Sequence, residues 1–220
     1  MNIYSCSIHI KKWSALMMRK QPQQGRSKEL VNIILQATEK AVCMHGLEGV
    51  TTPKVAELAG VSVGSIYQYF EDKQQMLECL LEQKSHEIGQ QLKQLLSLEA
   101  QQDLAVLVRL AINFGFAALT EHRFYLEVIK HWHNLPQRRA TEVMQQHFFE
   151  LGQQLLLQHH QGLCLNNLAS KLFIIINSTM YSMMRYVASQ PSVLAQDEIA
   201  EELTHMIMAY LHYKPAEKLL

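Results

Sequence analysis

Residues 51–73, TTPKVAELAGVSVGSIYQYFEDK, constrain the fold of this chain more than any other segment. Pro53 suits the first turn of a helix, because its missing N–H would have no helical partner there, and Thr52 can cap that helix. Gly60 can adopt the left-handed conformation that ends the helix, and Ser62 can cap a second helix directly after it. Two short helices joined by so tight a turn have the layout of a helix-turn-helix, whose second helix enters the major groove of DNA.

This segment resembles the DNA-binding domain of the tetracycline-repressor (TetR) family of transcriptional regulators. The likeness extends over about residues 28–81 and combines small residues, a turn glycine, a helix cap and an aromatic run at fixed offsets. The matching residues are Gly46, Thr52, Ala56, Ala59–Ser62, Gly64–Tyr67, Tyr69, Phe70 and Lys73. The rest of the chain matches the family only in length and helical character. A similar segment in an unrelated helical protein is the alternative.

The candidates for DNA contact lie mainly in the first turn of the second helix, where base edges and the nearest phosphates would be. Gly64 lets the backbone approach DNA closely. By resemblance, Tyr67 and Tyr69 project outward and bind phosphates, with half-buried packing as the alternative for each, and Gln68 reaches a base. Lys73 opens the next helix, whose free N–H groups favour a phosphate. The full set is Arg26, Lys28, Thr52, Lys54, Ser62, Val63, Gly64, Ser65, Tyr67, Gln68, Tyr69 and Lys73.

Charge is concentrated near the N-terminus. The 220 residues include 20 basic and 20 acidic side chains, which argues against general coating of nucleic acid. The first 28 residues contain basic side chains and no acidic ones, whereas residues 26–84 carry a net charge of −2. We therefore expect a flexible basic arm over residues 1–25, continued by Arg26 and Lys28, and DNA affinity from individually placed contacts.

Helical periodicity continues to the end of the chain, and no strand pattern of any length is present. The sequence predicts an all-α fold of about nine helices. We expect a three-helix helix-turn-helix DNA-binding domain over residues 26–86 and a helical effector-binding and dimerisation domain over residues 87–220. A fourth helix, from about residue 73 to residue 96, would link the two.

The C-terminal half offers no catalytic arrangement, because neither a nucleophile nor paired carboxylates lie on its apolar faces. His131 and His133 are two positions apart and do not share a helix face, so they do not make a metal site. We expect neither enzyme activity nor a metal or other cofactor. A helical small-molecule carrier or enzyme that uses a C-terminal cavity is the alternative.

The TetR resemblance implies an apolar effector site between the C-terminal helices. Methionine and aromatic side chains are core residues first of all, but they also line adaptable pockets. An apolar or amphipathic small molecule, oriented by a few polar groups, is therefore expected as the effector. The candidate lining residues are Phe114, Tyr125, His131, Trp132, Asn177, Met180, Tyr181 and Met184.

Residues 168–188 are apolar on more than one helical face, since Phe173, Ile174, Ile175 and Ile176 are consecutive. A helix in one small bundle needs a single apolar stripe, so a second apolar face requires a partner. In the resembling family the last two helices pair with their symmetry mates, which implies a homodimer. A fully buried central helix of a monomer is the alternative.

The cysteines are scattered without CxxC spacing, which favours free thiols in a reducing cytosol. No run of 18 apolar residues is apparent, and Lys11 and Lys12 follow the apolar part of the N-terminus, in the wrong order for a secretory signal. We expect a cytoplasmic protein without a membrane partner. The sequence leaves open whether Met1, Met17 or Met18 is the true start.

By resemblance, the chain is expected to be a ligand-responsive transcriptional regulator, most often a repressor in this family. It would bind a near-palindromic double-stranded operator as a homodimer, and a small-molecule effector would release it. The effector, the operator sequence, the regulated genes and the sign of regulation are not encoded in these patterns.

Overall fold

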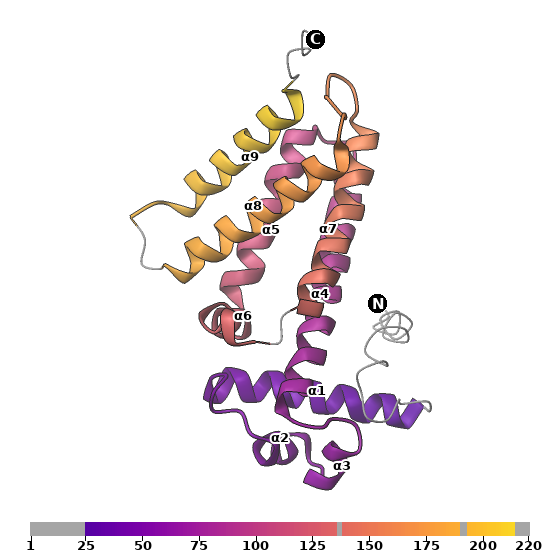
Figure 1. Cartoon of the computed structure of the whole chain (residues 1–220), viewed down its shortest axis with the longest axis vertical. Coiled ribbons are helices and arrows are strands. Elements are labelled where there is room, and N and C mark those ends of the chain that lie inside the picture. The colour runs from indigo at the N-terminus through magenta and orange to yellow at the C-terminus, as the bar shows by residue number, and fades with distance from the viewer. Residues whose placement is uncertain (1–24, 136–137, 190–192, 214–220) are drawn as a thin grey trace, which may run out of the picture. The chain divides into compact units, whose positions relative to one another are not determined.

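The computed structural model describes residues 25–135, 138–189 and 193–213, and these residues contain no strand. They form nine α-helices and one 3-10 helix, which confirms the predicted all-α fold (Figure 1). In order these are α1 (Gly25–His45), α2 (Thr52–Ala59), α3 (Val63–Tyr67), α4 (Lys73–Leu98), α5 (Leu104–Glu121), α6 (Arg123–Lys130), η3 (Trp132–Asn134), α7 (Arg138–Gln158), α8 (Leu168–Ala188) and α9 (Gln196–His212).

The described residues divide into two compact units. The first consists of residues up to Glu87 together with Arg123–Val143, and the second of Ile88–His122 together with residues from Met144 onward. The predicted domain boundary between residues 86 and 87 would place α6 in the C-terminal domain. In the structure, α6 packs on α1 and belongs to the first unit. The predicted division into a DNA-binding domain over residues 26–86 and an effector-binding domain over residues 87–220 stays a prediction.

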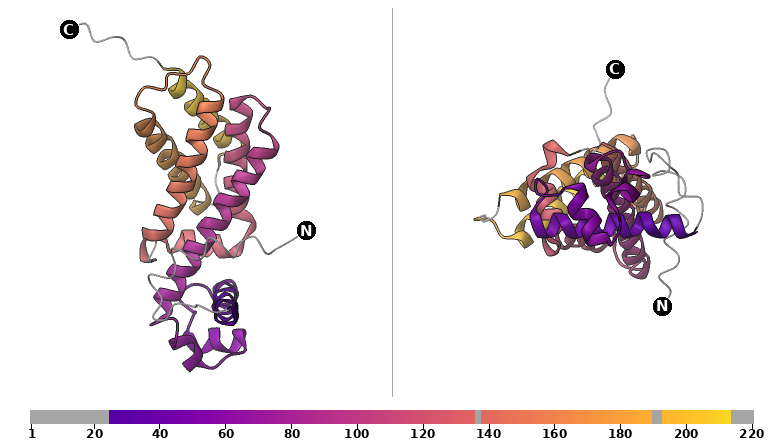
Figure 2. Two further views of the ribbon diagram at one scale, coloured as in Figure 1. Left: turned by 90° about the vertical axis from the view of Figure 1, so that its right-hand side faces the viewer. Right: turned by 90° about the horizontal axis from the view of Figure 1, so that it is seen from below.

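In the first unit, α2 and α3 lie on the same side of α1 (Figures 1 and 2). The N-cap of α2 is Thr51 rather than the predicted Thr52, whose side chain is buried. Gly60 has a φ of 66° and ends α2 in the predicted left-handed conformation. The side chain of Ser62 accepts a hydrogen bond of 3.0 Å from Ser65 N–H and caps α3, as predicted.

The core of the first unit joins the three N-terminal helices to α4 and α6. The spacing of Ile66 and Phe70, one helical turn apart, predicts that both face the core, and both are buried. Phe124 and Val128 of α6 belong to the same apolar cluster. The sequence also predicts Asp72 as the cap of α4, and Asp72 Oδ1 accepts a hydrogen bond of 2.8 Å from Gln75 N–H.

Two ion pairs add to this packing. Lys84 Nζ lies 2.8 Å from Glu39 and 3.1 Å from Glu87. Burial lowers the pKa of Lys84, but the two carboxylates outweigh burial and the pKa is raised overall. Glu82 is buried, with Arg139 Nε 3.7 Å from its carboxylate; burial raises the pKa of Glu82 and Arg139 opposes that rise. The pairs tie α4 to α1 and to the start of α7.

The second unit contains the end of α4, α5, most of α7, α8 and α9. At Gly89 of α4, an added Cβ would lie 2.5 Å from the ring of His147 on α7, so only glycine allows this approach. The buried ammonium of Lys171 donates hydrogen bonds to Cys164 O (2.8 Å) and Tyr210 O (3.2 Å). These bonds attach α8 to the end of α9 and to the loop that precedes α8.

Several boundaries differ from those expected. The sequence predicts a long helix from Pro136 to about Gln161, whereas α7 is seen over Arg138–Gln158 and Pro136 lies outside the described residues. The last helix, expected from Ser192, begins at Gln196, and Ser192 is likewise outside the described residues. Such differences of a few residues are typical of helix ends, where local signals are weak.

One helix among those described, α5, is long and apolar enough by length and composition to cross a membrane, which the sequence analysis did not expect. This is weak support for a membrane span. The buried side chains of α5, Leu104, Leu107, Ile112 and Phe116, belong to a helix that contacts both α8 and α9. Packing inside the bundle therefore accounts for these four side chains, whereas 22% of the helix is buried in all.

The cysteines in the described part of the chain, Cys43, Cys79 and Cys164, are free thiols, as expected. Burial raises the pKa of Cys79 to about 12, with the nearby carboxylate of Glu82 adding to the rise. A thiol with so high a pKa is a poor nucleophile at neutral pH. Cys6 lies outside the described residues.

Candidate functional site

The helix-turn-helix presents an open surface at the start of α3. Val63 is 36% exposed and Tyr67 43% exposed, and Ser62, Gly64 and Gln68 are also exposed. A Cβ added at Gly64 would have one neighbour within 4 Å, the Ser62 hydroxyl at 3.7 Å. The backbone of this turn therefore faces free space, which a DNA backbone or base edge could enter.

Two hydroxyls lie side by side on this surface. Ser62 Oγ and Ser65 Oγ are 2.8 Å apart, and Ser62 Oγ also accepts the N–H of Ser65. A hydroxyl has one hydrogen and two lone pairs, so this pair keeps a free site for an outside partner. Both serines can therefore cap α3 and contact DNA.

Two of the three lysines predicted to contact DNA, Lys54 and Lys73, already have protein partners. Lys54 Nζ donates to Gly49 O (2.9 Å), and Lys73 Nζ donates to Val50 O (3.2 Å). Both bonds attach to the connection between α1 and α2. An ammonium has three N–H donors, so each lysine retains hydrogens for a phosphate.

Other DNA candidates lie differently from expectation. Tyr69 is 6% exposed, so the expectation that it projects outward is wrong. The chain leaves the helix after Tyr67, and the ring of Tyr69 turns into the core. Arg26 and Lys28 lie in the first turn of α1 rather than in an arm. Residues 1–24 of the predicted arm are outside the described residues, and the DNA role of every candidate stays a prediction.

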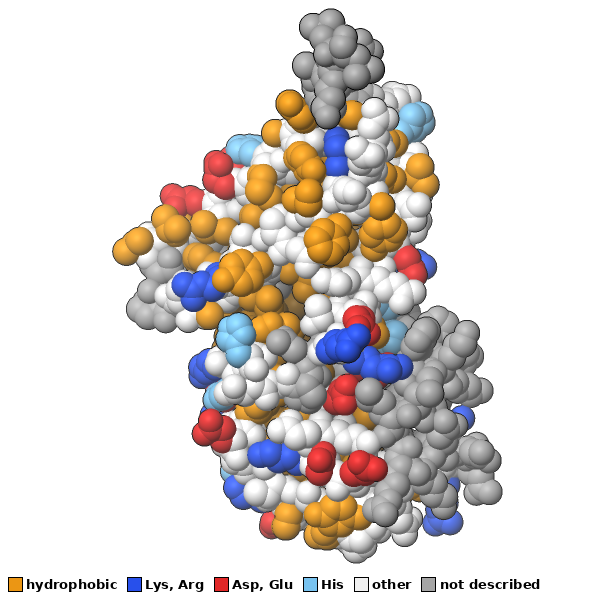
Figure 3. Space-filling model, in the orientation of Figure 1, with side chains coloured by type: hydrophobic (Ala, Val, Ile, Leu, Met, Phe, Trp, Pro, Cys, Tyr) orange, Lys and Arg blue, Asp and Glu red, His pale blue; other side chains and the backbone are white. Residues whose placement is uncertain are grey.

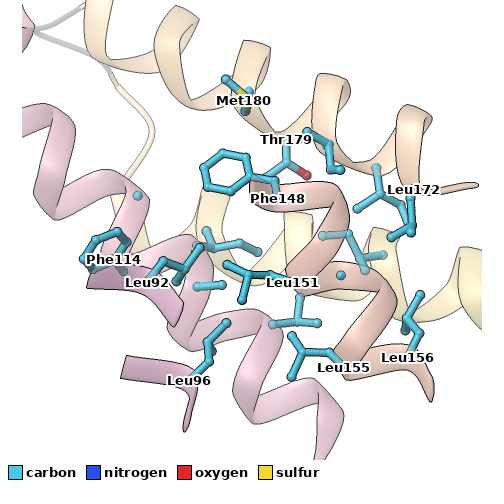
Figure 4. Close-up of a pocket in the computed structure, with 18 of the residues that line it drawn as sticks. Leu92, Leu96, Phe114, Phe148, Leu151, Leu155, Leu156, Leu172, Thr179 and Met180 are labelled. Carbon is cyan, nitrogen blue, oxygen red and sulfur yellow. The ribbon is translucent and has the colours of Figure 1, made fainter. Parts of the chain in front are cut away.

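The second unit contains an apolar cavity of about 160 Å³ that is partly open to solvent (Figure 4). Its walls come from α4, α5, α7, α8 and α9, including Leu92, Phe114, Phe148, Leu151 and Met183. No charged side chain lines it, and Thr179 is the one polar side chain in its wall. A cavity of about 150 Å³ lined by aliphatic and aromatic residues is large enough for benzene, so a single small ring fits.

Phe114 and Met180 are the predicted ligand residues that line this cavity. Asn177, Tyr181 and Met184 lie on α8 but do not line it. The side chain of Asn177 accepts a hydrogen bond of 2.9 Å from Gln145 and donates one to the α8 backbone. Tyr181 is 64% exposed. The helix thus turns these three away from the cavity.

Tyr125, His131 and Trp132 belong to the first unit and do not line the cavity. Tyr125 and Trp132 pack against the apolar cluster of that unit. Burial raises the pKa of Tyr125, and the carboxylates of Glu87 and Glu39 add to the rise. His131 Nδ1 lies 3.1 Å from Glu127 O. Contact of any of these residues with a ligand stays a prediction.

Sequence reasoning missed Thr179 and most of the leucines in the cavity wall. The signal for Thr179 was present, because it lies seven residues after Leu172 and four before Met183, on the apolar stripe of α8. A polar residue on that stripe would have been the better candidate for orienting a ligand.

A group of large apolar side chains lies on the surface of α8 and α9. Phe173 is 63% exposed, Ile174 49% and Met206 43%. Figure 3 shows hydrophobic side chains gathered over α8 on the face that it draws. We call Phe173, Ile174, Tyr181 and Met206, all of which are exposed, the outer apolar face.

Within residues 25–135, 138–189 and 193–213, no three His, Cys, Asp or Glu side chains are placed to hold a metal ion. This finding covers the described residues alone, and the expected absence of a metal or other cofactor stays a prediction.

The fold and the site together define a helix-turn-helix protein with an apolar cavity among the helices of its second unit. Residues 34–80 match the sequence model of the bacterial regulatory proteins of the tetR family. No functionally curated protein matches the chain. The described chain has the fold of the TetR-family transcriptional regulators, and its N-terminal helices include a segment that matches the sequence model of that family.

Solved structures agree with this assignment. A protein from Mesorhizobium loti, described as a TetR-family transcriptional regulator, is 16% identical to this chain and has a TM-score of 0.66. The match covers 86% of this chain and 98% of that one. FadR of Bacillus subtilis in complex with stearoyl-CoA is 14% identical, with a TM-score of 0.59 and coverage of 82% and 99%. RolR in complex with resorcinol is 14% identical, with a TM-score of 0.63 and coverage of 88% and 97%. Identities this low establish the likeness of fold alone.

Proposed function

We propose that this protein is a cytoplasmic, ligand-responsive transcriptional regulator that binds a near-palindromic operator as a homodimer. One observation carries the proposal: a helix-turn-helix with an open approach at Gly64 occurs in the same chain as an apolar cavity. The first can recognise DNA, and the second can hold a small molecule. Repression is the proposed sign of regulation.

The proposed effector is an apolar or amphipathic small molecule, because the cavity wall carries no charge that could neutralise an ionic ligand. The TetR-fold proteins FadR and RolR have been solved with stearoyl-CoA and resorcinol. At about 160 Å³ the cavity accepts a molecule nearer in size to resorcinol than to a long acyl chain.

The release mechanism that we propose acts through α4. This helix contributes Ile88, Leu92 and Leu96 to the cavity wall, and its first turns belong to the DNA-binding unit. An effector that binds better when α4 is displaced would favour a state with low operator affinity. A ligand with equal affinity for both states would change nothing.

The outer apolar face supports the proposed homodimer. Its exposed rings and aliphatic groups would be removed from water by a second copy of α8 and α9, at roughly 25 cal/mol for each Å² buried. Two recognition helices related by two-fold symmetry would then read successive major grooves. We therefore expect dyad symmetry in the operator, with half-site centres about 10 base pairs apart or a multiple of that.

A footprint on the DNA upstream of the gene for this protein tests the proposal. Phe173→Glu should shift the protein from dimer to monomer in sedimentation at micromolar concentration and weaken operator binding by about 100-fold or more, since a buried unpaired carboxylate is strongly unfavourable. Leu98→Glu is the matched control, because Leu98 is 77% exposed on α4. A wild-type monomer that binds its operator tightly would rule out the dimer.

A helical carrier or enzyme that uses the same cavity is the second candidate, and the cavity itself is the observation in its favour. We prefer regulation, because a carrier gives no reason for the open helix-turn-helix surface. A carrier would bind its ligand with equal affinity whether or not DNA is present.

A further inference from the structure

The hydroxyl of Thr179 is placed unusually for this protein. It belongs to the one polar side chain in the cavity wall, and Thr179 is 9% exposed. Its Oγ1 atom is buried and has no hydrogen-bond partner among the described residues. In Figure 4 it is the one oxygen among the side chains drawn around the cavity.

Four other hydroxyls inside the described helices donate to their own backbone. Thr38, Ser85 and Thr204 are buried, and each donates to the carbonyl four residues earlier, at 2.8, 2.9 and 2.7 Å. Ser178, next to Thr179, donates in the same way to Ile174 O at 2.7 Å. The helix offers Thr179 an equivalent bond, and the side chain does not make it.

The other side chains of the cavity wall do not supply the missing partner. The other side chains that line it are aliphatic, aromatic or thioether groups, or glycine. An unpaired buried hydroxyl is unfavourable, so a molecule that enters the cavity with a hydrogen-bonding group near Oγ1 gains that bond and also relieves the deficit. A purely apolar molecule of the same shape gains neither.

We propose that Thr179 determines the specificity of the cavity and selects a small, mostly apolar, uncharged molecule with one hydroxyl or carbonyl group. This inference rests on the proposed function, in which the cavity is the effector site. A phenol fits the stated class, because its ring matches the volume of about 160 Å³ and its hydroxyl can pair with Thr179. Carboxylates and amines are disfavoured, because no opposite charge faces the cavity.

Calorimetric titration of the full chain with phenol and with toluene tests the role of Thr179. Thr179→Val keeps the side-chain shape and removes the hydroxyl, and Thr179→Ser keeps the hydroxyl. The ratio of phenol affinity to toluene affinity should fall about tenfold in Thr179→Val and stay within about threefold of wild type in Thr179→Ser. The ratio cancels the different hydration of the two probes.

Thermal unfolding without ligand gives an independent readout. If the hydroxyl is unpaired, Thr179→Val should unfold at or above the wild-type temperature, because no hydrogen bond is lost. A variant that unfolds well below wild type would mean that the hydroxyl has an internal partner, which would overturn the inference. So would an unchanged phenol-to-toluene ratio.

Failure of the proposed function would look different. The cavity is not the effector site if neither probe binds wild type. The same holds if a larger side chain in the cavity wall, as in Ala111→Phe, leaves both probe affinities unchanged. The Thr179 proposal is then wrong as well. If both probes bind in the cavity with a ratio insensitive to Thr179→Val, the effector site stands and the proposed selectivity is wrong.

Discussion

Gly64→Leu is expected to reduce operator affinity by about 100-fold or more while leaving the fold intact. A Cβ atom added at residue 64 would have one neighbour within 4 Å, the Ser62 hydroxyl at 3.7 Å. The leucine side chain therefore extends into open space. If that space is where DNA lies, the added side chain holds the backbone of α3 away from the groove. A loss of about 2.7 kcal/mol corresponds to this factor. Fluorescence anisotropy with labelled operator measures it.

Gln94→Leu is the matched control for this prediction, because it places the same side chain on an exposed position of α4 in the second unit. The unfolding temperature of both variants should stay close to that of wild type. Operator binding by Gly64→Leu with wild-type affinity would show that the start of α3 does not approach the DNA.

Ala111→Phe is expected to make the protein insensitive to its effector. Ala111 lines the cavity from α5, and a phenyl group at this position would occupy most of about 160 Å³. Effector affinity should fall about 100-fold, because the ring takes the volume that the ligand needs, while operator affinity should stay within a few-fold of wild type. The effector concentration needed to release labelled operator reports the change.

Ala105→Phe provides the matched control, since Ala105 is exposed on the same helix and does not line the cavity. Overfilling can itself cost about 1–3 kcal/mol of stability, so the unfolding of both variants must be compared. Unchanged release of operator from a folded Ala111→Phe protein would place the effector elsewhere.

The helix-turn-helix could be predicted closely because its determinants are local. A left-handed glycine at residue 60 and side-chain caps at Ser62 and Asp72 depend on neighbours within four residues, and the structure has all three. The orientation of Tyr69 could not be derived in this way. It follows the end of α3, where helical periodicity no longer fixes the direction of a side chain.

The cavity was harder to predict because it is assembled from five helices distant in sequence. Phe114 and Met180 were found on apolar faces, but the apolar face of α6 packs against α1, so Tyr125 and Trp132 join the core of the first unit. Local pattern gives the apolar face of a helix without saying which helix covers it. Thr179 was missed because residue type alone does not mark a buried hydroxyl without a partner.

Linkage between the cavity and the DNA surface is the central claim, and calorimetry tests it most directly. The molecule that releases the operator is titrated into the protein alone and into the protein–operator complex. Binding to the complex should be weaker by the same factor by which that molecule weakens operator binding, since coupling between two sites is reciprocal. Equal affinities in the two titrations would contradict the account, because such a ligand could not shift the protein toward its DNA-free state.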